Sequence, residues 1–174
     1  DVLAYLKTIV NKQDEESLLR IINFPTRGIG KTSIERIREF SIKQNISLWE
    51  VLKQIHDIDI NLNEGSKNRI HHFFKLIEKY SSNQFENAFD LTSSLIENLK
   101  LIELLSKENT IESTSKIENI RELLNAIKTF SDEQENNTIS NFLDQSVLVN
   151  ENDNNESKEN EDYVSLMTIH QSKG

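Results

Sequence analysis

A short run of residues near position 30 has the types and spacing needed to bind an anion. Gly28 and Gly30 lack a Cβ atom, so a phosphate could approach the backbone N–H groups between them. A helix expected to begin at Lys31 would add unpaired N–H groups and a partial positive charge. The pattern predicts a phosphate site, although the same spacing also suits a plain helix connector with glycines for tight packing. The predicted site comprises Arg27, Gly28, Ile29, Gly30, Lys31 and Thr32.

The same residues do not form a nucleotide-binding loop. Gly30-Lys31-Thr32 matches the end of the pattern G-x-x-x-x-G-K-[ST], but the first glycine of that pattern would fall at Pro25. The residues before it also have the pattern of an amphipathic helix, whereas that loop follows a buried strand. A dinucleotide fingerprint would need glycine at Ser33. We therefore expect neither ATP nor a dinucleotide to bind here.

Other residues typical of catalytic or metal sites are poorly arranged for those roles. Asp14-Glu15-Glu16 are adjacent and would point apart on a helix, so we expect a solvated helix start. His71-His72 are also neighbours, and the chain has no Cys and no H-E-x-x-H motif. Trp49, Phe73 and Phe74 lie on apolar stripes and are expected in the core. We predict no catalytic residue, metal site or cofactor site in this sequence.

The composition favours a helical chain. Among 174 residues, one is Pro and four are Gly, which argues against a β-sandwich or β-barrel. No stretch approaches the roughly 20 apolar residues that cross a bilayer, and the first residues lack the layout of a signal peptide. We expect a soluble, intracellular protein that does not partner a membrane.

The net charge of −9 is unevenly spread. Residues 151–162 carry six acids and one Lys, a net of −5, whereas residues 20–43 carry six bases and two acids, a net of +4. Screening limits the reach of charge to about 8 Å at physiological salt, so the local balance matters more than the sum. The basic segment contains the predicted phosphate site.

Hydrophobic periodicity predicts an all-α fold, an irregular bundle of about seven to eight helices. Short helices are predicted over 1–10 and 14–24, a third from Lys31 to about Asn45, and a fourth from a capping box at Ser47 to about Ile55. Thr138 would cap a last short helix. Further stripes comprise Ile70, Phe73, Phe74 and Ile77; Leu91, Leu95, Leu99 and Ile102; and Ile117, Ile120, Leu123, Leu124, Ile127 and Phe130.

The C-terminal residues break the helical pattern. Residues 150–162 are rich in Asn and Glu and are expected to form an acidic, disordered tether. Residues 163–174 favour a short β-strand, which has no ladder partner in the sequence. Because the chain also begins inside an apolar helix, we expect a fragment of a larger protein.

Two resemblances follow from these motifs. Residues 28–32 (GIGKT) resemble the helix-hairpin-helix signature, which grips DNA phosphates without reading bases. Residues 1–6 (DVLAYL), 14–30 (DEESLLRIINFPTRGIG) and 164–174 (VSLMTIHQSKG) resemble UvrD/PcrA/Rep-type superfamily 1 DNA helicases in order and separation. In that family the first two blocks lead from the second motor domain into a helical 2B subdomain, and the last returns to the motor as motif V.

The resemblance implies that the parent is an ATP-dependent 3′-to-5′ DNA helicase that uses ATP and magnesium in the bacterial cytoplasm. The family's ATP-site motifs have no counterpart here, so we expect no ATPase activity or cofactor in this chain. Residues 1–149 would be the 2B-like subdomain, with 1–12 at the motor junction. The residues from Arg27 to Thr32 would hold duplex DNA, and Thr168 and His170 would contact single-stranded DNA.

Two other interpretations remain. The helical surface could be an interaction or autoinhibitory module that docks the motor domains or a DNA repair protein without touching DNA. The chain could also be an independent helix-hairpin-helix repair protein.

Overall fold

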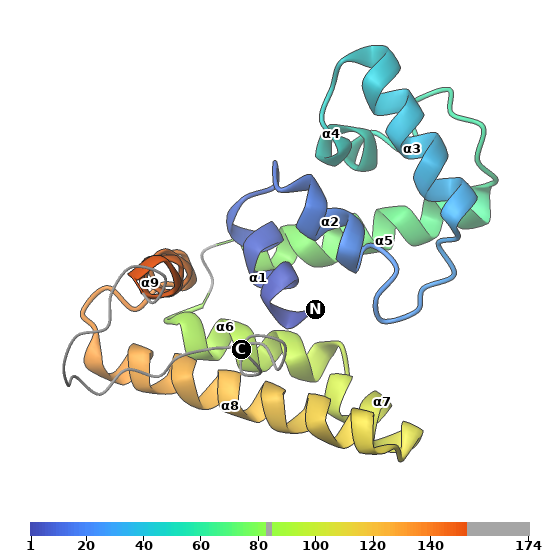
Figure 1. The fold of residues 1–174 in the computed structure, drawn as a ribbon. Helices are drawn as coiled ribbons and strands as arrows, with labels where there is room; N and C mark the ends of the chain where they lie inside the picture. Colours follow the sequence, from blue (N-terminus) through green and yellow to red (C-terminus); the bar gives the residue numbers. More distant parts are fainter. Residues whose placement is uncertain (83–84, 153–174) are drawn as a thin grey trace.

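The computed structural model describes residues 1–82 and 85–152, and every regular element in that range is a helix (Figure 1). The described range therefore confirms the predicted all-α class. Its nine helices are α1 (Val2–Val10), α2 (Glu15–Ile21), α3 (Lys31–Gln44), α4 (Leu48–Lys53), α5 (Glu64–Ser81), α6 (Ala88–Asn98), α7 (Leu101–Glu108), α8 (Ile111–Glu133) and α9 (Ile139–Asn152).

Helix α1 lies between two groups of helices (Figure 1). In the N-terminal group, α2 and α5 pack on α1, and α4 packs on α3 and α5. In the C-terminal group, α6 and α7 pack along α8, while α9 contacts α1 and α6. Two hydrogen bonds from the end of α5 reinforce this arrangement. The Ser81 hydroxyl donates to the carbonyl of Ile9 at 3.1 Å, and the Tyr80 hydroxyl donates to the carbonyl of Ser94 at 2.9 Å.

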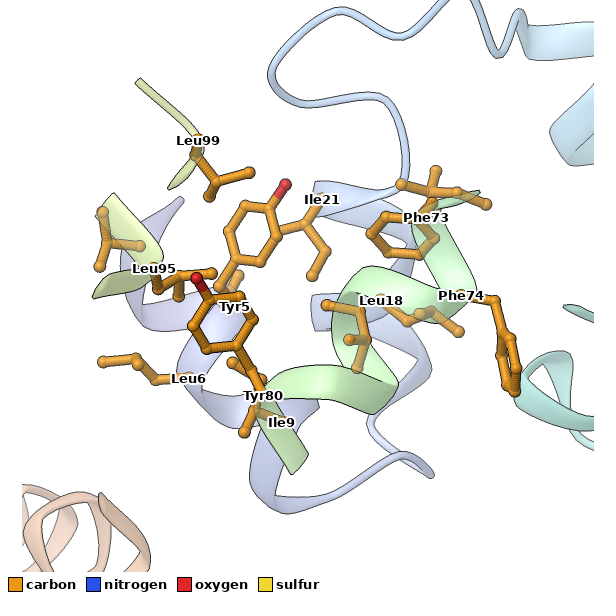
Figure 2. Close-up of a cluster of buried hydrophobic side chains, with 14 of the residues drawn as sticks. Tyr5, Leu6, Ile9, Leu18, Ile21, Phe73, Phe74, Tyr80, Leu95 and Leu99 are labelled. Carbon is orange, nitrogen blue, oxygen red and sulfur yellow. The ribbon is translucent and has the colours of Figure 1, made fainter. Parts of the chain in front are cut away.

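The core is centred on α1. Tyr5 and Leu6 of α1 are fully buried and lie beside residues of α2, α5 and α6 (Figure 2). The aromatic residues predicted to be core residues are also buried: Trp49 is 7%, Phe73 1% and Phe74 3% exposed. These side chains are therefore structural, as the apolar stripes indicated.

Side-chain caps explain several helix starts. Asp14 accepts the backbone N–H three residues ahead at 3.0 Å, which confirms the predicted start of α2. Ser47 caps α4 by accepting the N–H of Glu50 at 3.3 Å, but the Glu50 carboxylate accepts from Gln54 and does not complete a capping box. A complete capping box instead begins α8 at Thr110.

Three boundaries differ from the sequence-based expectation. Helix α2 ends at Ile21, before the predicted end at residue 24. The stripe from Leu91 to Ile102 is divided between α6 and α7, because Lys100 adopts the left-handed conformation at φ 52°. This division contributes to a helix count above the predicted seven to eight. Helix α9 reaches Asn152, inside the expected 150–162 tether. The rest of that tether and the predicted strand over 163–174 lie outside the described residues.

Candidate nucleic-acid interface

The turn between α2 and α3 is held by one side chain. Asn23 Oδ1 accepts the backbone N–H groups of Arg27 at 2.9 Å and Ile29 at 3.0 Å. The side chain of Ile29 is fully buried. Gly28 lies at φ +75°, a conformation that favours glycine. The expectation that the N–H of Ile29 is open to a phosphate is therefore wrong, because Asn23 already accepts its hydrogen bond.

Arg27 is half-buried, and its guanidinium points into the protein. Its Nη2 donates to the Tyr5 hydroxyl, which in turn donates to the carbonyl of Phe24. The guanidinium carbon also lies 5.9 Å from the ring centre of Tyr5 and 5.2 Å from that of Phe73. Burial raises the pKa of the Tyr5 hydroxyl, although Arg27 acts in the opposite direction. The Arg27 Nη1 donates to the carbonyls of Ile21 at 3.0 Å, Phe24 at 2.6 Å and Pro25 at 3.2 Å.

The opposite face of the turn is open to solvent. Gly28, Gly30, Lys31 and Thr32 are exposed. Gly30 occupies the N-cap position of α3, and no side chain caps the helix there. In the part of the chain that the structure describes, the N–H groups of Lys31 and Thr32 have no acceptor. A Cβ atom added to Gly30 would meet nothing within 4 Å. The start of α3 thus offers unpaired N–H groups on an unobstructed surface.

Arg69 of α5 lies beside this open face. A Cβ atom on Gly28 would sit 3.5 Å from both Cδ and Nε of Arg69, and one on Gly65 would sit 3.5 Å from its Nη1. The Arg69 Nη2 donates to the Ser66 hydroxyl at 3.2 Å. Sequence reasoning missed this exposed cation, because its helix is distant in the sequence and only the tertiary fold brings it to the turn.

The surface around the turn has unneutralised positive charge. Among the described residues, no carboxylate forms an ion pair with Lys31 or Arg69. The neighbouring acid at the start of α5, Glu64, lies 3.8 Å from Lys67 and 3.8 Å from His56. This local excess of positive charge would attract an anion despite the net negative charge of the chain.

The remaining predicted contacts and site types give little further information. Thr168 and His170 lie outside the described residues. Within 1–82 and 85–152, no group of three or more His, Asp or Glu side chains is arranged to hold a metal ion. No helix in those ranges has the length and apolar character of a membrane span.

Comparison with known proteins identifies the family. The family model for the UvrD-like helicase C-terminal domain matches residues 1–174. The ATP-dependent DNA helicase PcrA of Bacillus subtilis (strain 168) is 32% identical over all of this chain, and that of Staphylococcus aureus (strain Mu50 / ATCC 700699) is 33% identical. PcrA of Staphylococcus epidermidis (strain ATCC 35984 / DSM 28319) is 31% identical, again over the whole chain.

The chain spans 24% of the length of each of these relatives. The match extends through the middle helices, where the sequence motifs were least specific. It confirms the resemblance to UvrD/PcrA-type superfamily 1 helicases. The chain therefore belongs to the UvrD-like helicase C-terminal domain family.

Proposed function

We propose that this chain is a 2B-like subdomain that binds the phosphates of duplex DNA within an ATP-dependent DNA helicase. The observation that carries the proposal is the open start of α3, where Lys31 and Thr32 present unpaired N–H groups next to an unobstructed Gly30. Helix starts of this kind bind phosphate without reading base sequence. The relatives, which are named DNA helicases, supply the choice of nucleic acid as the ligand.

The enzymatic activity is proposed for the whole protein. Its motor domains would hydrolyse ATP with magnesium and drive 3′-to-5′ unwinding in the bacterial cytoplasm, while the described helices would contact the duplex. Thr168 and His170 would contact the single strand, as the family resemblance implies. A role in DNA repair, with a repair protein as partner, belongs to the same proposal.

The first test measures duplex binding against salt. The 174-residue chain is titrated onto a short fluorescent DNA duplex, and anisotropy gives the affinity between about 50 and 200 mM salt. Lys31→Ala is expected to lower the slope of log affinity against log salt by about one, because one phosphate contact is lost. Arg121→Ala is the matched control, since Arg121 is exposed on α8 and lies in the other helix group.

Gly30→Ala tests whether the backbone itself is approached. Its φ of −76° suits alanine and the added Cβ meets nothing within 4 Å, so the melting temperature should change little. The methyl group would still stand between a phosphate and the N–H groups of α3, so duplex affinity should fall. If neither Gly30→Ala nor Lys31→Ala alters binding, the proposed site is wrong.

A second function is favoured by a separate observation. An open groove of about 700 Å³ runs between α1, α2, α7 and α8, and Leu3 on its wall is 40% exposed. Such a groove suits an interaction module that docks the motor domains and does not contact DNA. In that case the chain would show no duplex binding even at low salt, but immobilised chain would retain the separately purified motor domains.

A further inference from the structure

Two arginines adjoin the turn, and their guanidinium groups are placed in opposite ways. We infer that Arg69 contacts the DNA phosphate at this turn, whereas Arg27 is a positioning residue that holds the turn in shape. The inference rests on the proposed function, because it assigns residues within the same phosphate site. It differs from the sequence-based expectation, which placed Arg27 among the DNA-binding residues and did not include Arg69.

Arg27 is engaged on both terminal nitrogens. Nη1 donates to three backbone carbonyls and Nη2 donates to the Tyr5 hydroxyl. A phosphate contact through these terminal nitrogens would have to replace those acceptors. Reaching a phosphate would therefore strip hydrogen bonds from carbonyls at the end of α2 and in the turn. Arg27 instead joins the turn to α1, through Tyr5.

Arg69 has one terminal nitrogen without an acceptor, whereas both terminal nitrogens of Arg27 are engaged. Only its Nη2 has an acceptor in the described part of the chain, the Ser66 hydroxyl, so Nε and Nη1 remain open. The side chain passes over two glycines, with Cδ and Nε next to Gly28 and Nη1 next to Gly65. It is exposed and has no carboxylate partner among the described residues. The hydrogen bond to Ser66 limits its conformations before DNA arrives, which reduces the entropy lost on binding.

This arrangement divides the phosphate contacts between two helices. The start of α3 supplies backbone N–H groups and Lys31, and α5 supplies the guanidinium of Arg69. The Gly28 turn is the point where the two meet: a Cβ atom there would lie in ordinary van der Waals contact with the Arg69 stem at 3.5 Å, but the residue would be strained at φ +75°. The glycine is therefore required by the backbone conformation of the turn.

The experiment makes the same two substitutions at each arginine of the 174-residue chain. The change to Gln removes the positive charge, and the change to Lys keeps it. For each variant, anisotropy with the short duplex gives the affinity and the salt slope, and thermal unfolding gives Tm. Arg69→Gln should weaken binding about tenfold at low salt and lower the slope by about one, with Tm unchanged. Arg69→Lys should restore the slope, because it keeps the charge. Arg121→Gln, an exposed arginine on α8, should match the wild type in all three measurements.

Arg27→Gln should behave differently. Its Tm should fall by about 5 °C or more. Arg27→Lys should not recover the Tm, because a single ammonium group cannot reproduce the planar guanidinium that donates both to the backbone carbonyls and to the Tyr5 hydroxyl. Measured well below its Tm, the Arg27→Gln salt slope should equal that of the wild type. If Arg27→Gln fails to fold, its positioning role is supported, and Arg69→Gln decides the phosphate contact.

The outcomes separate the two proposals. If the wild-type chain binds the duplex but Arg69→Gln keeps the full salt slope, the inference is overturned while the proposed function stands. A lower slope in Arg27→Gln with an unchanged Tm would also overturn it, since the two roles would be reversed. If the wild-type chain does not bind the duplex at any salt concentration, the proposed function fails and the inference fails with it.

Discussion

At the scale of single residues, Asn23 determines which face of the turn can meet a ligand. Its side-chain oxygen accepts the N–H groups of both Arg27 and Ile29, so these two donors are already paired. Lys31 and Thr32, which follow at the start of α3, keep unpaired donors on the exposed surface. One amide side chain therefore removes the N–H of Ile29 from the donors that a phosphate could use, while the start of α3 keeps its own.

Two substitutions of Asn23 should separate folding from binding. Asn23→Ala removes the shared acceptor and should lower the free energy of unfolding by about 2 kcal/mol, because two N–H groups lose their partner. Asn23→Asp keeps an acceptor at the same place, so its stability should stay within about 1 kcal/mol of the wild type. The added negative charge should nevertheless weaken duplex binding at low salt. Urea unfolding and duplex anisotropy measure the two effects, and an Asn23→Asp chain with wild-type affinity would contradict the proposed site.

The residue-level site could be predicted only in part from the sequence. The glycines, Lys31 and Thr32 could be proposed as site residues because their types and spacing are local features. The inward direction of Arg27 depends on Tyr5 and on the carbonyls at the end of α2, and the position of Arg69 depends on the packing of α5 against the turn. Such tertiary contacts leave no periodic signal in a single sequence.

At the scale of helices, the cap of α2 gives the stability a pH dependence. The N–H of Ser17 donates to the Asp14 carboxylate, and this hydrogen bond lowers the pKa of Asp14 below its usual value of 3.8. A lowered folded-state pKa means that the ionised form stabilises the fold. The contribution is therefore complete above the unfolded-state pKa and is lost as the pH falls through the folded-state value.

Variants of Asp14 test this cap. Asp14→Ala should lower the free energy of unfolding by about 1 kcal/mol at neutral pH, whereas Asp14→Asn should retain most of the cap. Urea unfolding at a series of pH values below 5 should show that the wild type loses its advantage over Asp14→Asn as the carboxylate is protonated. A constant difference between these two chains down to the acid limit would show that the carboxylate hydrogen bond does not contribute.

The existence of most helices could be predicted, but some of their ends could not. Apolar stripes at helical spacing identified α5 and α8 because each buries one face. The break at Lys100 was missed because the stripe continues across it: Leu99 and Leu101 are both buried on either side of a left-handed residue. Lysine has no special preference for that conformation, so the chain is turned there by the packing of its neighbours and not by a local signal.

At the scale of the whole molecule, α1 connects the two helix groups. Its buried residues contact α2 and α5 on one side, and α9 packs against it on the other. Figure 2 shows Tyr5 and Leu6 between the side chains of α5 and those of α6. The buried side chains of both groups and of α1 form one continuous cluster, so the turn between α2 and α3 is supported by packing that includes both groups.

This arrangement predicts that both groups unfold together. The single tryptophan, Trp49 in α4, reports on the N-terminal group, while far-UV circular dichroism reports on all helices. The urea midpoints from the two signals should coincide, because unfolding either group would expose the α1 core to water.

Leu6→Ala should reduce stability by about 2 to 5 kcal/mol and move both midpoints equally, since Leu6 is fully buried. Ile42→Ala is the matched control: this side chain is 78% exposed, so the change should stay within about 0.5 kcal/mol. If Leu6→Ala moves the Trp49 midpoint but leaves a separate later transition in circular dichroism, the C-terminal group folds independently and α1 is not the shared core.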